Sequence, residues 1–379
     1  MIIRQKYLSN DIYGKGVHMD NKIKQTIENY IKLEQCYRRE IALIIVANVE
    51  GKTIEYDDYE NTSVLSEYYT IDEFETISTT YKKLGYEVFC FFSERDFMNA
   101  IINHKINTTK KLLVINSAQT GTYIGRKSLI PAFCEYYKIM HTGSNPYVVS
   151  LCRDKFHTNT IINPFVSYHL NTYLFSNQEK WINDIKPQIG ERIIIKLNCE
   201  SASIGLTTDN ILYYKGQESD YYISNLAKKY NQSIVAQQFI AGYEVELPII
   251  LSTMNTPLIP VGISHQGKFF IGDYILDYTT RFNHLYDFYN LNEHNWELSV
   301  QLQQEAIQIA KLLGMEGFCR IDFRIDCNEQ YYVSDIASNP HITEDSSFAF
   351  TFNEMGYSYD NMFSCLIGCT IDKYYKSLQ

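Results

Sequence analysis

Apolar and polar residues alternate in blocks over the first part of the chain, and these blocks predict strands that are followed by helices. Strands are expected at 41–47, 86–92 and 111–116, and the first is a continuous apolar run typical of a buried parallel strand. Helices are expected at 70–84, 97–104 and 128–138. Thr70 and Glu73 have the spacing of a capping box at the start of the first helix. This order predicts a small doubly wound α/β domain.

From Asp154 onward the order of the expected elements changes to an α+β arrangement with antiparallel sheets. Strands are expected at 192–197, 233–240, 244–252, 257–263 and 269–276. Helices are expected at 178–186, 220–230, 296–313 and 359–373. The domain organisation that we expect is an N-terminal extension with a helix at 1–40, the α/β domain at 41–150, and two α+β lobes at 151–240 and 241–379.

One stretch near the C-terminus combines a strand pattern with charge. The sequence GFCRIDFRIDCNEQYYVSDIASNP, at 317–340, predicts two strands joined by a polar turn. Alternation puts Arg320 and Asp322 on one face of the first strand, and Asp335 can face them from the second. Charges on an otherwise apolar hairpin need partners, and Mg²⁺ together with phosphate supplies both signs. The hairpin therefore predicts a site for a metal and phosphate.

Two further motifs suit a nucleotide. In RIIIKLNCESASIG a strand delivers Lys196, and the small residues that follow would let backbone N–H groups approach phosphate oxygens. In VAQQFIAGYEVE a strand breaks at 241–242, where Phe239 offers an apolar slot for adenine and Glu244 lies within reach of a ribose hydroxyl. Taken alone, each motif is also compatible with an ordinary turn or hairpin.

Two loops are candidate sites for an anionic group. Arg126 and Lys127 follow a strand of the α/β domain, where ligands of open sheets bind, although a solvated turn with two surface cations is an equal alternative. Ser346 begins a helix whose N-terminus would suit a substrate carboxylate, and the alternative is a serine that only caps the helix.

Composition restricts the class of protein. A chain of 379 residues with 45% hydrophobic and 21% charged residues is typical of a soluble globular protein with two or three domains. A net charge of −10 argues against a general nucleic-acid or acidic membrane surface. The nine cysteines form no CxxC pair, and the first residues lack the apolar core of a signal peptide. We therefore expect a cytoplasmic protein with reduced thiols.

The order of the motifs is more specific than any one of them. A DK pair at 154–155, KLNCESASIG at 196–205, QQFIAGYE at 237–244, RIDF at 320–323 and DIASNP at 335–340 occur in one series. This series resembles the ATP-grasp superfamily, and most closely its D-alanine–D-alanine ligase branch, from about residue 41 to the C-terminus. The resemblance implies an ATP-grasp fold in which two α+β lobes hold ATP, and a reaction that transfers the γ-phosphate to a carboxylate before an amine displaces it.

The resemblance also implies roles for individual residues. The residues that match ATP-binding positions are Lys155, Lys196, Glu200, Ser201, Ser203, Gln237, Gln238, Phe239, Ile240 and Glu244. Asp322 and Asp335 match ligands of Mg²⁺, for which Mn²⁺ could substitute, and Arg320 matches the residue that stabilises the tetrahedral oxyanion. Ser346 and Arg281 match positions near the substrate, and Arg126 is our additional candidate there.

Several positions depart from the family pattern. The family lid usually reads E-G-S-S-[VI]-G, whereas Ser201 and Ala202 stand at its second and third positions here. Phe282 and Gln237 replace a tyrosine and a glutamate. The metal motif usually reads E-x-N, so that Ala337 cannot bind a metal, and Asn339 is the candidate replacement. The motif residues for ATP are largely retained, whereas those for the amino acid are altered. We therefore interpret the departures as a sign that the substrate differs from that of the family.

The sequence therefore predicts an ATP-dependent carboxylate–amine ligase, ADP-forming, that acts on amino-acid-like small molecules other than D-alanine. Two alternatives stay open. One is a ligase that loads an amino acid onto a carrier-protein thiol, and the other is a nucleotide-binding regulatory protein with degenerate catalysis. Because family members are often dimers, the resemblance also implies that this protein could form a homodimer.

Overall fold

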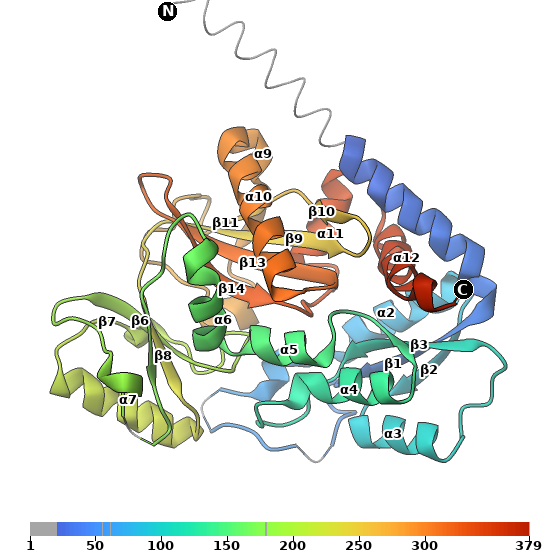
Figure 1. Ribbon diagram of the computed structural model, residues 1–379, viewed down its shortest axis with the longest axis horizontal. Coiled ribbons are helices and arrows are strands. Elements are labelled where there is room, and N and C mark those ends of the chain that lie inside the picture. The colour runs from blue at the N-terminus through green and yellow to red at the C-terminus, as the bar shows by residue number, and fades with distance from the viewer. Residues whose placement is uncertain (1–20, 55, 61, 179, 379) are drawn as a thin grey trace, which may run out of the picture.

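The structure is a computed structural model that describes residues 21–378 apart from 55, 61 and 179 (Figure 1). Its first sheet is parallel, with the strand order β2-β1-β3-β4. The strands are β1 (Ile41–Ala47), β2 (Glu87–Phe91), β3 (Lys111–Ser117) and β4 (Met140–His141). All seven residues of β1 are buried because helices cover both faces of this sheet.

The helices of this layer are α2 (Ile71–Lys83), α3 (Glu94–Ile102) and α4 (Leu129–Tyr136). The α2 helix packs on the face that carries Leu43, and α3 and α4 pack on the face that carries Ile44. The Thr70 side chain accepts a hydrogen bond from the backbone N–H of Glu73, whose carboxylate accepts one from Thr70 in return. The doubly wound sheet and the capping box are thus confirmed.

The second sheet has four antiparallel strands in the order β5-β8-β6-β7. They are β5 (Thr172–Phe175), β6 (Arg192–Leu197), β7 (Ile211–Tyr213) and β8 (Ile234–Gln238), and α7 (Gln217–Tyr230) follows β7. The apolar side of α7 packs against Ile193 and Ile195 of β6. The opposite face of this sheet is therefore free to border a cavity.

The third sheet has the order β12-β11-β9-β13-β14, and β10 pairs with the end of β9. Its strands are β9 (Tyr243–Leu251), β10 (Asn255–Pro257), β11 (Val261–Ser264), β12 (Asp287–Asn290), β13 (Gly317–Ile325) and β14 (Tyr331–Ala337). The α10 helix (Trp296–Leu313) packs on one face through Leu302, Ala306 and Ile309. The second and third sheets with their helices form the two α+β lobes that the sequence predicts.

The first and last helices of the described chain lie side by side (Figure 1). A helix at 21–37 packs against α12 (Tyr359–Leu378), and both join the core beneath the first sheet. Gly368 in α12 is so close to the helix at 21–37 that a Cβ atom there would collide with the carbonyl of Tyr30. The helix at 21–37 is therefore part of the packed body, whereas residues 1–20 of the expected extension lie outside the described residues.

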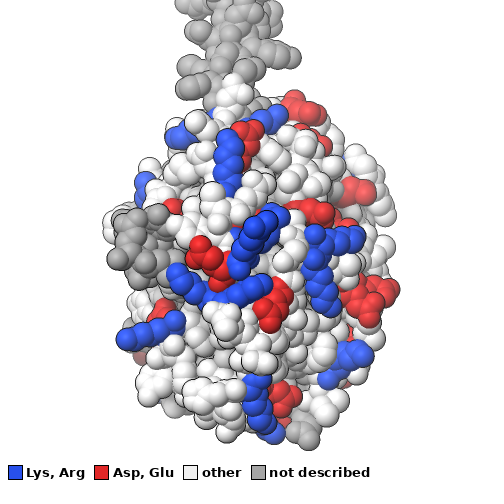
Figure 2. Space-filling model, turned by 90° about the vertical axis from the view of Figure 1, so that its right-hand side faces the viewer, with Lys and Arg blue, Asp and Glu red and all other residues white. Residues whose placement is uncertain are grey.

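The remaining helices are short: α5 (Pro146–Arg153), α6 (Lys155–Ile162), α8 (Tyr278–Phe282), α9 (Leu291–His294) and α11 (Ser347–Glu354). Within the part of the chain that the structure describes, no helix is long and apolar enough to cross a membrane. Figure 2 shows basic and acidic side chains interspersed over the face at the right of Figure 1. Each expected segment after residue 40 holds one of the three sheets, and we keep its boundaries as a proposal.

Three expected elements are wrong. The expected helix at 178–186 is a loop with a short 3-10 turn at Ile182–Asp184. Trp181 packs into the core between the second sheet and α7, and the backbone of Asn183 adopts the left-handed conformation. The expected strand at 257–263 splits into β10 and β11, since the prolines at 257 and 260 cannot donate to a sheet ladder. The expected strand at 269–276 is a loop, and among the described residues its one strand-like pairing is an isolated bridge between Gly242 and Gly272.

Candidate active site

The predicted hairpin at 317–340 forms the centre of the site. Strand β13 lies between β9 and β14 and is buried along its whole length. Its odd-numbered side chains, Cys319, Ile321, Phe323 and Ile325, face the core beneath α10. The even-numbered side chains Arg320, Asp322 and Arg324 line a large cavity between the second and third sheets, which we call the nucleotide cavity. Period-two alternation therefore separates core from site along this strand.

An irregularity in β14 brings Asp335 into the same cavity. The register pairs Asp322 with Asp335 but Phe323 with Val333, so that Ser334 is an extra residue. Strict alternation would put Asp335 on the face of Val333, which belongs to the core. The bulge turns both Ser334 and Asp335 toward the nucleotide cavity. The observed position opposite Asp322 thus depends on a bulge that the sequence did not reveal.

Lysines surround Asp335 at this end of the cavity. Lys155, the first residue of α6, places its Nζ 3.1 Å from Asp335 Oδ1. Burial opposes the ionisation of Asp335, but the charges of Lys155 and Lys196 outweigh it and lower its pKa to about 2. Burial lowers the pKa of Lys196 to about 8, although Asp335 opposes the shift. An ionised carboxylate and two cations therefore meet here, which is the charge pattern of a site for metal and phosphate.

Arg320 is held in place by two carboxylates. Its Nε and Nη2 donate to the two oxygens of Asp322 at 2.7 and 2.8 Å, and its Nη1 lies 2.9 Å from Glu246 Oε2 on β9. Burial raises the pKa of Asp322 above its ordinary value, and the adjacent Arg320 limits the rise. A guanidinium fixed at three nitrogen atoms is preorganised to stabilise negative charge on a reacting group.

The other end of the nucleotide cavity is apolar with a few polar groups. Ile194, Phe239 and Ile275 form a small cluster there, and Arg192 stacks over the ring of Phe239 with its Cζ 4.7 Å from the centroid. Gln237 is only 1% exposed, yet its side-chain nitrogen and oxygen have no hydrogen-bond partner among the described residues. A buried amide without partners is costly, so this one is suited to a ligand that both donates and accepts, as adenine does.

Other predicted nucleotide residues border the same space. Gln238, Ile240 and Glu244 line the cavity beside Phe239. Glu244 is joined through Oε2 to Arg324 at 3.0 Å, and Arg324 also donates to the carbonyl of Ile240 at 3.1 Å. Arg324 and Glu246 were not predicted, although the alternation of β13 placed Arg324 on the face of Arg320.

The predicted lid at 200–205 borders the nucleotide cavity through residues 200–204. Ala202 and Ser203 have φ angles of 51° and 55°, so that two residues with side chains adopt the left-handed conformation in succession. Such a backbone persists only where its surroundings hold it. Ser203 lines the cavity, and its hydroxyl donates to the carbonyl of Leu276.

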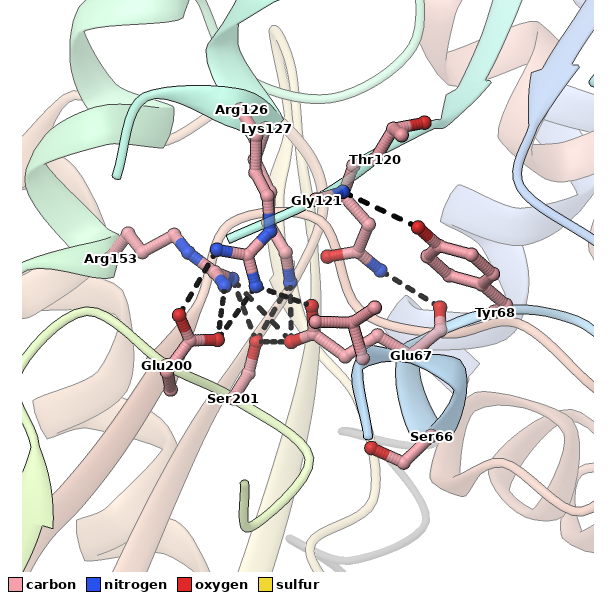
Figure 3. A network of polar contacts seen from close by, with 12 residues as sticks. Ser66, Glu67, Tyr68, Thr120, Gly121, Arg126, Lys127, Arg153, Glu200 and Ser201 are labelled. Atoms are coloured by element: carbon pink, nitrogen blue, oxygen red, sulfur yellow. Dashed lines mark hydrogen bonds and ion pairs between the residues drawn. The ribbon is translucent and has the colours of Figure 1, made fainter. Parts of the chain in front are cut away.

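A buried ionic cluster, shown in Figure 3, holds the start of this lid. We use the name lid cluster for Glu67, Arg126, Lys127, Arg153, Glu200 and Ser201. Arg126 donates to Glu200 Oε1 at 3.0 Å and to Oε2 at 2.6 Å, and Arg153 donates to Glu200 Oε2 at 3.0 Å. Ser201 bonds to Lys127, Arg153 and Glu67. The lid is thereby anchored to segments that precede the second sheet.

A second cavity meets the nucleotide cavity at Ala202, Glu246 and Arg320, which line both. Ser346 lines this second cavity and is the N-cap of α11, where its hydroxyl accepts from the backbone N–H of Ala349 at 3.2 Å. The capping alternative is thus observed, and the position at a helix N-terminus also suits an anionic group. Arg281 belongs to α8, and its side chain lies outside the described residues.

Comparison with known proteins agrees with this geometry. The family described as "D-ala D-ala ligase C-terminus" matches residues 161–368, which is more than half of the chain. The chain belongs to the D-alanine–D-alanine ligase family. It is therefore an ADP-forming ATP-grasp ligase.

Among curated relatives, the D-alanine–D-alanine ligase of Nitrosomonas europaea is 25% identical over 251 residues, which cover 64% of this chain and 74% of the relative. The enzyme of the same name from Natranaerobius thermophilus is 26% identical over 255 residues, covering 65% and 67%.

Solved structures share the fold. The D-alanine–D-alanine ligase from Bacillus anthracis complexed with ATP matches with a TM-score of 0.66 at 15% identity, over 89% of this chain and 99% of that one. VanG D-Ala:D-Ser ligase from Enterococcus faecalis matches with a TM-score of 0.61 at 14% identity, over 87% and 99%. These matches confirm the ATP-grasp fold.

The structure of this ligase corrects two predictions in the lid region. Arg126 was expected either to contact substrate or to lie on the surface, but its side chain is 0% exposed and is committed to Glu67 and Glu200. Glu200 borders the nucleotide cavity, yet its carboxylate turns toward Arg126 and Arg153. Both residues therefore belong to the contacts that hold the start of the lid, and Glu67 and Arg153, which no sequence pattern paired with them, complete the arrangement.

The structure also argues against Asn339 as a metal ligand. Strand β14 ends at Ala337, and the chain then turns toward the first sheet. There the Asn339 side-chain amide donates to the carbonyl of Asn116 at 2.9 Å, and its oxygen lies near Gly143. Within the described residues, no group of three or more His, Cys, Asp or Glu side chains could hold a metal. Asp322 and Asp335 remain, and Mg²⁺ is commonly bound by one or two carboxylates together with substrate phosphates.

Proposed function

We propose that this ligase joins a carboxylate to an amine through an acyl phosphate. The observation that carries the proposal is the meeting of the two cavities at Arg320. A carboxylate oxygen would attack the γ-phosphorus of ATP and displace ADP. The amine nitrogen would then attack the acyl carbon, releasing phosphate and a proton and leaving an amide. Both reacting centres would lie beside one fixed guanidinium.

The residues at the two ends of the nucleotide cavity suit different parts of ATP. Gln237, whose amide lacks a partner among the described residues, would bind the adenine together with Gln238, Phe239 and Ile240. Glu244 would bind the ribose. Lys155 and Lys196 would neutralise phosphate oxygens, because phosphoryl transfer depends on positioning and charge neutralisation. Asp322 and Asp335 would hold Mg²⁺, which would supply positive charge to the phosphate oxygens when bound.

Arg320 would stabilise the oxyanion that forms when the amine attacks. The guanidinium is already oriented by Asp322 and Glu246, so it needs little rearrangement during the reaction. Ser346 would hold the carboxylate of the acceptor at the start of α11, and Arg281 would lie near the phosphates. The lid at 200–205 would exclude water, which otherwise hydrolyses the acyl phosphate.

The substrates that we propose are amino-acid-like molecules other than a pair of D-alanines. Ala202 lines the second cavity where the family lid has a serine, so this ligase lacks one hydroxyl at the substrate. The second cavity also continues into an open groove, with which it shares Tyr286 and Phe288, and the groove extends to Tyr357 and Tyr359. The space beyond Ser346 therefore suits a substrate that is larger than alanine and in part aromatic.

The test is ADP release with ATP, Mg²⁺ and paired amino acids, followed by mass spectrometry of the products. We expect an amide product and ADP in equal amounts, with weaker activity for D-alanine alone than for a larger acceptor. Activity that requires a carrier-protein thiol would favour the thiol-loading alternative. Nucleotide binding without ADP release over the whole panel would refute catalysis and favour a regulatory protein.

A further inference from the structure

The phosphate end of the nucleotide cavity offers few oxygen atoms to a metal. Of the two hairpin carboxylates that line it, Asp322 uses both oxygens to bind Arg320. Asp335 uses Oδ1 to accept from Lys155, and its Oδ2 has no hydrogen-bond or ion-pair partner among the described residues. One open carboxylate oxygen, with a second carboxylate opposite it on the adjacent strand, is enough for one Mg²⁺ whose other ligands are phosphate oxygens and water.

A second metal would need oxygen atoms on the far side of Asp335. Residues two apart on a strand share a face, and Ala337 stands at that position with no oxygen in its side chain. Asn339, two residues further on, also borders the space beside Asp335, but its side-chain nitrogen is tethered to the carbonyl of Asn116. The serines nearby are neutral, and both oxygens of the Glu200 carboxylate are bound by arginines.

Positive side chains occupy this far side instead. A small cavity contains both Asp335 and Ala337, and Lys127, Arg153 and Lys155 also line it. The lid cluster that supplies two of these cations has three basic side chains and two carboxylates, so it carries one positive charge in excess whenever Lys127, whose pKa burial lowers to about 7, is protonated. Figure 3 shows Lys127 and Arg153 directed toward Ser201 of the lid. A divalent cation placed beside them would be repelled.

We propose that this ligase binds a single Mg²⁺ with each nucleotide, held by Asp335 and Asp322. The excess positive charge of the lid cluster, together with Lys155, replaces a second metal on the side of Ala337. This inference rests on the proposed nucleotide site, but it concerns only the number of metal ions and their ligands. It also gives the lid cluster a second role, because its cations supply positive charge beside the phosphates while the cluster holds the lid that excludes water.

The experiment counts metal ions directly. The full chain, in excess over a non-hydrolysable ATP analogue, is titrated with Mn²⁺, and free Mn²⁺ is measured by electron paramagnetic resonance. We expect one Mn²⁺ for each bound nucleotide. Two bound Mn²⁺, or nucleotide binding that needs no metal, would overturn the inference and leave the proposed reaction intact. Failure of the analogue to bind at all would instead refute the proposed function, and this inference with it.

Three variants identify the ligands. Asp335→Asn should weaken Mn²⁺ binding at least tenfold, whereas the control Glu75→Gln, on the exposed side of α2, should leave it unchanged. Asn339→Ala should keep one Mn²⁺ per nucleotide, because its side chain faces Asn116. A loss of Mn²⁺ binding in Asn339→Ala, with an unchanged circular dichroism spectrum and melting temperature, would show that Asn339 is a ligand and would overturn the assignment.

Discussion

Removing one negative charge from the lid cluster should destabilise the protein more than removing one positive charge. The cluster holds the cations Arg126, Lys127 and Arg153 against the carboxylates Glu67 and Glu200. Glu200→Gln keeps the side-chain volume but leaves three cations with one carboxylate. Arg126→Met leaves two of each. The excess of buried charge therefore rises to two in the first variant and falls to zero in the second.

The expected magnitudes follow from burial. Arg126 and Glu200 are almost completely inaccessible to solvent, so solvent screening is weak. Removing one partner of a buried pair costs about 3–5 kcal/mol, and we expect Glu200→Gln to fall in that range. Arg126→Met should cost about 1–3 kcal/mol, because Glu200 and Glu67 keep Arg153 at 3.0 and 3.5 Å.

The assay is urea unfolding followed by tryptophan fluorescence at pH 6, where Lys127, whose pKa burial lowers to about 7, carries its charge. Glu218→Gln is the matched control, since the pair of Glu218 with Lys215 is exposed and should be worth less than about 1 kcal/mol. A Glu200→Gln variant as stable as the control, or one more stable than Arg126→Met, would refute the charge argument. The double variant should be less destabilised than the sum of the single changes, because the two residues contact each other.

Four further predictions follow from single sites. Asp335→Asn and Asp322→Asn should lower the rate of ADP release by at least about a hundredfold with an unchanged circular dichroism spectrum, because they remove charge that acts on the transferred phosphate. Gln237→Leu should weaken binding of an ATP analogue about tenfold in calorimetry while leaving the melting temperature equal or higher, since it removes a buried amide that has no partner among the described residues. Gly368→Ala should lower the melting temperature by several degrees, because the new methyl group would collide with the carbonyl of Tyr30 and push the helix at 21–37 away from α12. Burial lowers the pKa of Lys127 to about 7, so the unfolded chain binds more protons than the folded one between about pH 7 and the ordinary lysine value; urea stability should therefore rise with pH across this window in the native chain and less in Lys127→Met.

Local sequence patterns were sufficient to predict those helices and strands in which every residue is compatible with the same pattern of burial. The continuous apolar run of β1 and the helical pattern of α10 gave the bounds Ile41–Ala47 and Trp296–Leu313 because nothing in these segments conflicts with burial. The segment at 178–186 also had a helical pattern, yet packing of Trp181 decided its structure. Tertiary contacts of one large side chain can outweigh the propensity of its neighbours.

The site was predictable where its chemistry lies on one strand and unpredictable where it depends on contacts between distant segments. The shared face of Arg320 and Asp322 could be predicted from the alternation of the strand. Asp335, in contrast, reaches the cavity through a bulge at Ser334, which no periodic pattern contains. The same limit applied to Asn339, for which sequence spacing suggested a ligand although the chain has already turned toward Asn116.

The lid shows most clearly how distant segments determine chemistry here. Its single carboxylate, in Glu200, matches a nucleotide-binding position, and in isolation it would be assigned to the nucleotide. Arg126 and Arg153 lie far from it in sequence, on the segments before the second sheet, and they turn this carboxylate into an anchor. Because Glu67 lies between Ser66 and Tyr68, which line the second cavity, the same cluster connects the lid with the place where the acceptor would bind. An acceptor that displaces Ser66 or Tyr68 would therefore move a charge paired with the lid, so binding of the acceptor should affect how tightly the lid closes over ATP.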